Sequence, residues 1–183
     1  SSVTQSIQTI IQQYKLLDSG AMDAAEATEY LGDVMVAVAY NLAKEESVAM
    51  QEVISGIETA GNMIKTSGGS FEWFTSVIGT LSEVMNASGS ETANAMKMIA
   101  ARTLKSKEAI EDLADSGEDM EDIEIAASNA EKALNSIGLS ARNSNGDFKD
   151  LEVILGEVAA KWDTLNNSTK QYVSEQLAGN NRR

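Results

Sequence analysis

Apolar residues recur every three or four positions along most of the chain, with polar residues between them. This spacing is typical of amphipathic α-helices. Eight stretches carry it, at 3–17, 27–38, 46–65, 71–84, 96–103, 120–137, 151–165 and 172–177. The pattern predicts an all-α fold, a multi-helix bundle of about seven to nine helices.

Small and polar residues between these stretches predict where helices stop and start. Glycine suits the left-handed residue that ends a helix, and Ser or Asp suits its N-cap. Expected helix stops are Gly20, Ser67-Gly68-Gly69 and Gly89. Expected N-caps are Asp23 with Glu26, Ser70, Ser90, and Ser168 with Gln171. In the third stretch, Gly56, Ala60 and Gly61 leave a smooth face that another helix can approach closely.

Residues 138–149 interrupt the helical pattern. Asn145-Gly146 suits the two central positions of a type I′ turn, with Leu139 and Ala141 before it and Phe148 after it. We therefore expect one short β-hairpin near residues 138–149.

A calcium loop is the alternative interpretation of this segment, with Asn143, Asn145 and Asp147 as ligands. Counting from Asn143, the loop pattern requires glycine where Phe148 stands and glutamate where Ile154 stands. The sequence therefore argues against calcium binding, and we expect no metal and no cofactor.

The length of 183 residues permits one bundle or two small helical lobes. There is no proline, which favours helices joined by glycine and serine turns. The weakest point of the pattern is Ser116-Gly117. We expect an N-terminal helical lobe at 1–115 and a C-terminal lobe with the hairpin at 116–183, with one continuous domain as the alternative.

Charge and composition exclude several functions. The net charge of −14 and the pI near 4.3 argue against direct readout of nucleic acid and against an anionic membrane surface. The best apolar run, Val34 to Ala43, is too short to span a bilayer. The chain lacks both histidine and cysteine, which removes the commonest catalytic and metal-binding side chains. Since it starts at Ser1-Ser2, it reads as a piece of a longer protein.

No arrangement of residues predicts catalysis. A Ser–Lys pair would have to use Ser106 with Lys105 or Lys107, yet neighbours on a helix point in different directions. Gly68-Gly69 lacks the lysine of a phosphate-binding loop. Met35, Met96 and Met120 fall at core spacing, which favours core filling over an adaptable binding surface. We therefore expect no enzyme activity.

The segment from Glu108 to Glu124 holds nine carboxylates and no basic residue. It is either a solvated helical face or a site for a basic partner or a divalent cation. The candidate partner-binding residues are Glu111, Asp112, Asp115, Glu118, Asp119 and Asp122.

Three nearby segments, Glu131 to Leu139, Arg142 to Asp150 and Ile154 to Leu165, are followed by Leu177-Ala178-Gly179 and then Arg182-Arg183. Together these segments resemble the core region of phage and prophage tail tape measure proteins. That family shows a helix end with isoleucine-glycine, a polar hairpin and a helix with lysine-tryptophan-aspartate. The residues that carry the resemblance are Leu134, Ile137, Gly138, Gly146, Trp162, Asp163, Leu165 and Gly179.

The resemblance implies a structural role in tail length determination and tail assembly, with release during DNA ejection. It implies tail tube and tail assembly proteins as partners, with self-association left open. The implied location is the virion tail, and the host cytoplasm during assembly. It implies no catalytic residues. The alternative is a helical adaptor or chaperone-like binding module with an acidic docking face.

Recurring stops indicate a folded bundle rather than a measuring rod. A continuous helix at about 1.5 Å per residue would extend this chain to roughly 275 Å. The glycine and serine stops and the hairpin instead predict compaction, to a radius of gyration of ~16 Å.

Overall fold

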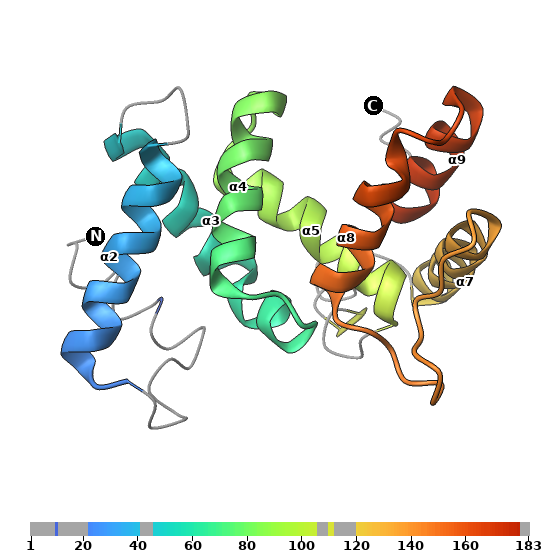
Figure 1. Ribbon diagram of the computed structural model, residues 1–183, viewed down its shortest axis with the longest axis horizontal. Coiled ribbons are helices and arrows are strands. Elements are labelled where there is room, and N and C mark those ends of the chain that lie inside the picture. The colour runs from blue at the N-terminus through green and yellow to red at the C-terminus, as the bar shows by residue number, and fades with distance from the viewer. Residues whose placement is uncertain (1–9, 11–21, 41–45, 106–109, 112–119, 180–183) are drawn as a thin grey trace. The chain divides into compact units, whose positions relative to one another are not determined.

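The computed structural model describes residues 10, 22–40, 46–105, 110–111 and 120–179. Within these residues it contains seven helices and no strand, so the predicted all-α fold is confirmed. The helices are α2 (Ala24–Tyr40), α3 (Glu46–Thr66), α4 (Phe71–Met85), α5 (Gly89–Leu104), α7 (Met120–Ser136), α8 (Leu151–Trp162) and α9 (Asn167–Ala178) (Figure 1). The first predicted helix, at 3–17, lies outside the described residues except for the buried Ile10.

The chain forms two compact units. Unit 1 comprises Ser1–Lys65 and Ser70–Asn94, and unit 2 comprises Thr66–Gly69 and Ala95–Arg183. Helix α5 therefore supplies its first residues to unit 1 and the rest to unit 2. The boundary that the sequence suggested, Ser116-Gly117, lies outside the described residues.

In unit 1, α2 packs against α4. The core contains most of the predicted apolar faces of α3 and α4. The half-buried residues are Val77 and Leu81, and the buried ones are Val53, Ile57, Ala60, Ile64, Phe71, Phe74 and Ile78. The smooth face of α3 is confirmed at Gly56, where an added Cβ would lie 2.6 Å from Cδ1 of Ile78. The rings of Tyr30 and Phe71 join α2 to α4, with centroids 5.8 Å apart. Burial, together with the hydrogen bond and charge of Glu72, raises the pKa of Tyr30, so its phenol stays protonated.

Two predicted N-caps are confirmed. The Asp23 carboxylate accepts from the amide of Glu26 at 2.9 Å, and Glu26 accepts in return from the amide of Asp23 at 2.8 Å. The Ser70 hydroxyl accepts from the amide of Trp73 at 3.2 Å. These contacts supply partners to backbone N–H groups that the first turn of a helix cannot satisfy internally.

Two other predicted helix starts are wrong. Helix α5 is capped by Ser88 rather than Ser90, because Ser88 forms a reciprocal capping box with Glu91. The preceding helix, α4, ends at Met85, and the next residue, Asn86, takes the left-handed role assigned to Gly89, with a φ of 50°. Helix α9 is capped by the Asn166 side chain, which accepts from Thr169, rather than by Ser168.

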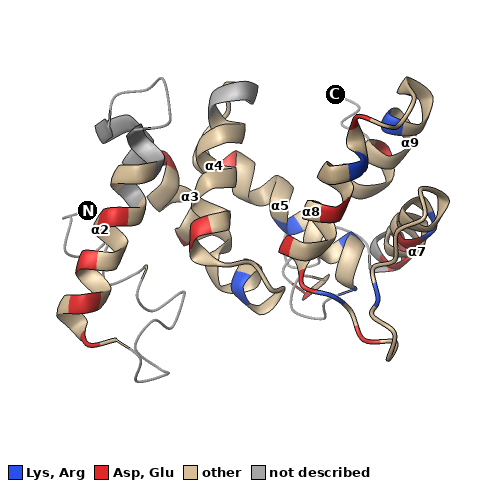
Figure 2. Ribbon diagram, viewed as in Figure 1, with Lys and Arg blue, Asp and Glu red and all other residues tan. Residues whose placement is uncertain are grey.

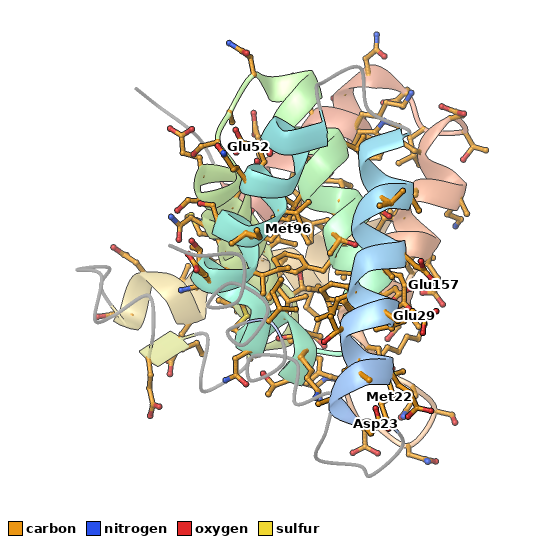
Figure 3. All side chains as sticks on the ribbon, turned by 90° about the vertical axis from the view of Figure 1, so that its left-hand side faces the viewer. Met22, Asp23, Glu29, Glu52, Met96 and Glu157 are labelled. Atoms are coloured by element: carbon orange, nitrogen blue, oxygen red, sulfur yellow. The ribbon has the colours of Figure 1, made fainter. Side chains whose placement is uncertain are left out.

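In unit 2, α7 packs against α9. The predicted faces of α5 and α7 are buried at Met96, Ala100, Thr103, Ala127, Ala130, Leu134 and Ile137. Met96 lies in the interior (Figure 3), as core filling requires, whereas the side chains of Met35 and Met120 are outside the described part. Tyr172, expected on the apolar face of α9, is 42% exposed, and its neighbour Val173 is buried instead.

None of the described helices is both long enough and apolar enough to cross a membrane.

Two glycines inside helices offer a matched test of the packing in unit 1. An added Cβ at Gly89 would overlap the backbone of Glu52, whereas one at Gly32 would meet nothing within 4 Å. We expect Gly89→Ala to lower the free energy of unfolding by about 1–3 kcal/mol through overpacking. The control Gly32→Ala should raise it by roughly 0.5–1 kcal/mol through helix propensity. Urea titrations followed by circular dichroism measure both, and equal effects would contradict the described packing.

Candidate functional site

The segments that resemble tape measure proteins lie together in unit 2. They form the end of α7, the hairpin segment at 137–150, helix α8 and the turn into α9. We call this region the hairpin module. Its geometry shows what each motif residue does.

Gly138 ends α7 in a Schellman motif. Its φ is +74°, and its amide donates to the carbonyl of Asn135 at 3.0 Å. The amide of Leu139 donates to the carbonyl of Leu134, also at 3.0 Å. This pair of bonds is the pattern that closes a helix through a left-handed glycine. The isoleucine-glycine of the motif is therefore a helix stop, with Ile137 buried beneath it.

Lys161 of α8 completes the end of α7. Its Nζ donates to the carbonyl of Ile137. A lysine at this position satisfies a carbonyl that has no intrahelical partner, and its positive charge complements the negative end of the helix dipole. An added Cβ on Gly138 would lie 3.1 Å from this Nζ, so glycine also leaves room for the lysine.

The predicted hairpin is present in a reduced form, as one antiparallel bridge between Arg142 and Phe148. The predicted type I′ turn is wrong. It requires positive φ at both central residues, and the non-glycine residues with positive φ in the described part are Asn86 and Lys105. Instead the amide of Gly146 donates to the carbonyl of Asn143 at 3.1 Å, so Gly146 is the last residue of the turn rather than a central one, with φ +90°.

The Asn143 side chain explains this choice of turn. Its Oδ1 accepts from the amides of Asn145 at 2.9 Å and Asp147 at 3.1 Å. Asparagine commonly binds its own backbone in this way, and the contact favours a turn starting one position earlier than an Asn-Gly pair predicts. The oxygen that a calcium loop would have used is thus occupied by backbone amides.

Arg142 holds the hairpin against α7. Its Nε donates to Oε1 of Glu131 at 3.0 Å, and one terminal nitrogen donates to the carbonyl of Gly146 at 2.8 Å. Its guanidinium carbon lies 3.8 Å from the centroid of the Phe148 ring, a cation–π contact. One side chain therefore contacts the helix, the turn and the opposite side of the bridge.

Glu131 also binds Lys105, which follows α5, at 3.5 Å. Burial raises the pKa of Glu131, but the hydrogen bond from Arg142 and the charges of Lys105 and Arg142 outweigh burial. The net pKa is lower than the ordinary value of 4.5, so the carboxylate is charged at neutral pH.

The remaining motif residues shape the connection from α8 to α9 and the end of α9. Asp163 is the C-cap of α8, and the amide of Leu165 donates to the carbonyl of Trp162 at 3.2 Å. Lys170 of α9 lies 5.9 Å from the centroid of the Trp162 ring. Gly179 ends α9 with φ +87°, where an added Cβ would collide with Arg102.

The module contains contacts that sequence reasoning missed. It assigned no role to Glu131, Arg142 or Lys161, nor to the ion pair of Lys149 with Glu157 at 2.8 Å. A signal did exist, since a basic residue just after a helix end often serves that end. However, the contacts of Arg142 with Glu131, of Lys149 with Glu157 and of Lys161 with Ile137 each join residues at least eight positions apart, beyond any helical spacing.

The candidate acidic site is described only in part. Glu111 and Asp122 are exposed, whereas Asp112, Asp115, Glu118 and Asp119 lie outside the described residues. A second acidic stretch lies in α2, which carries acidic residues and no basic ones (Figure 2). Figure 3 labels Glu29 of this helix and Asp23, which precedes it. No group of three or more acidic side chains in the described residues has a metal-binding arrangement.

The described motif residues end helices, close a turn or tie two elements together. This arrangement defines the chain as an all-α structural module. The sequence family of phage-related minor tail proteins matches residues 4–179. The chain therefore belongs to the phage-related minor tail proteins, a family that places it in the virion tail in a structural capacity. No solved structure matches it.

The charge of Glu131 makes the stability of unit 2 dependent on pH. The pKa of Glu131 is lower in the folded protein than in the unfolded chain. The contribution of Glu131 to the free energy of unfolding is therefore fully present above its pKa in the unfolded chain, and it is lost as pH falls through its pKa in the folded protein. We expect Glu131→Gln to cost about 1 kcal/mol at pH 7, the typical net value of such a contact. The cost should begin to shrink as pH falls below the ordinary glutamate pKa, and it should approach zero below the lower pKa of Glu131 in the folded protein.

Urea unfolding of both proteins at pH 7 and at acidic pH measures this difference. Glu124→Gln is the control, since this carboxylate is exposed on the same helix and should leave stability unchanged at both pH values. A cost that is the same at both pH values would contradict the charged contact.

Proposed function

We propose that this chain is a folded segment of a tail tape measure protein, acting in tail length determination and tail assembly and leaving the tail during DNA ejection. The observation that carries the proposal is the resemblance of the three-part motif. Its support is that the three parts meet in one module: Lys161 of the third part binds Ile137 of the first, and Arg142 of the second binds Glu131. Membership of the minor tail protein family agrees with this role.

The proposed segment is a folded hub or end domain of the tape measure protein. The two compact units and the helix stops at Asn86, Lys105, Gly138 and Gly179 oppose one continuous rod. Its proposed partners are tail tube subunits and tail assembly proteins, met in the host cytoplasm before the virion tail is complete.

Deleting codons 22–179 in frame from the complete phage gene tests this role. We expect tails of altered length or a failure of tail assembly, seen by negative-stain electron microscopy of lysates. If the segment were extended helix, tails would shorten by roughly 240 Å, at about 1.5 Å per residue. Normal assembly with unchanged length would contradict the proposal.

Leu134→Asp is the matched control for length. It places a charge at a fully buried position of the hairpin module but leaves the number of residues unchanged. If the folded module matters for assembly, this variant should lower the yield of tails, while the tails that do form keep their normal length.

A second candidate function is docking of a basic partner on the acidic end of α7. Its support is the exposure of Glu121, Asp122 and Glu124 beside the exposed Ile125. Asp122→Asn with Glu124→Gln should then reduce tail yield. The control pair Glu29→Gln with Asp33→Asn removes the same charge from the exposed face of α2. Equal yields from the two double variants would contradict docking at α7.

A further inference from the structure

The start of α8 is capped by the backbone of a distant segment. The N-cap residue, Asp150, forms no side-chain capping bond. Instead the amide of Leu151 donates to the carbonyl of Ser67 at 2.8 Å, and the amide of Glu152 donates to the carbonyl of Gly68 at 3.3 Å. These amides are the first two of the helix, which have no partner within it.

The segment that supplies these carbonyls is Thr66–Gly69, which comprises the last residue of α3 and the turn that leads to α4. Although the rest of α3 and all of α4 lie in unit 1, these four residues belong to unit 2 by their contacts. Ser67 and Gly69 are buried there. We call this segment the capping turn.

Gly68 is required for the contact. Its φ is +79°, which disfavours any side chain, and an added Cβ would collide with Asp150. Close approach of the two backbones therefore depends on glycine at position 68. Other helices behave differently, since the Asn166 side chain caps α9 from within its own segment.

We propose that the capping turn is a detachable main-chain cap of α8, and that its release opens the first turn of α8. The cap consists of main-chain hydrogen bonds, one of them long, and it needs no chemical change to open or close. Since the same residues connect α3 to α4, any rearrangement of that connection changes the capping of α8. The capping turn thus links the α3–α4 connection to the hairpin module. The proposal that it detaches does not rest on the proposed function.

Amide hydrogen exchange in the whole chain, followed residue by residue by NMR, tests this proposal. Asn167 and Ser168 are the internal reference, because they occupy the same first two positions of α9. We expect Leu151 and Glu152 to exchange at least roughly tenfold more slowly than this reference, corresponding to about 1.4 kcal/mol. They should exchange faster than Leu155 and Val158 in the middle of α8, because the cap opens locally.

Two results in the unmodified protein would overturn the proposal. Exchange of Leu151 and Glu152 as fast as the reference would mean that there is no cap. Exchange as slow as that of Val158 would mean that the cap does not detach.

Gly68→Ala removes the cap selectively. It should bring exchange at Leu151 and Glu152 to the rate of the reference, while α7 and α9 keep theirs. Gly146→Ala is the matched control, because Gly146 has a similar φ of +90° but open space around it. Protection at Leu151 and Glu152 that survives Gly68→Ala, or that Gly146→Ala removes equally, would contradict the proposal.

Asp150→Gly provides a rescue that is independent of overall stability. It removes the side chain that an alanine at position 68 would meet, and glycine is tolerated at an N-cap. In the double variant Gly68→Ala with Asp150→Gly, the amides of Leu151 and Glu152 should again exchange slowly. The logarithm of their protection factor should recover to at least half of its value in the unmodified protein. A double variant that remains unprotected would exclude the collision with Asp150 as the cause.

Discussion

The carbonyl groups at the C-terminal end of α7 are the constraint on which the hairpin module depends. A helix cannot satisfy its last carbonyls internally, and leaving them buried without partners is costly. The left-handed conformation of Gly138 lets backbone amides donate to two of these carbonyls, and Lys161 of α8 donates to a third. Because this lysine comes from the next helix, closing α7 also places α8. The hairpin between them is then held by Arg142 on Glu131.

This arrangement explains why the motif is divided into three segments. The segments are complementary parts of one local structure, in which the second and third each supply a basic side chain to the first. A chain that simply measured length would need no such contacts, because continuous helix is stabilised along its own axis. The contacts instead describe a folded structural element of a phage-related minor tail protein.

The sequence predicted the helices well because their apolar faces follow a local rule. Residues three or four apart share a face wherever the helix packs, so Val53, Ile57 and Ile64 could be assigned to the core. The failures occurred where several residues compete for one role. Ser88 and Ser90 both suit an N-cap, and the reciprocal contact with Glu91 selected Ser88. Tyr172 and Val173 both suit the apolar face of α9, and Val173 is the one buried.

The hairpin shows the same limit more sharply. Asn145-Gly146 alone favours a type I′ turn, but the Asn143 side chain binds two amides and shifts the turn by one position. The sequence by itself determined the all-α class, the helical faces and the position of the hairpin, since these follow from spacing and local conformational preference. Only the tertiary structure decided the partners of Glu131, Arg142 and Lys161 and the capping of α8 by Ser67 and Gly68. Those contacts join residues far apart in the chain, and a hydrogen bond depends on distance and direction that no local pattern contains.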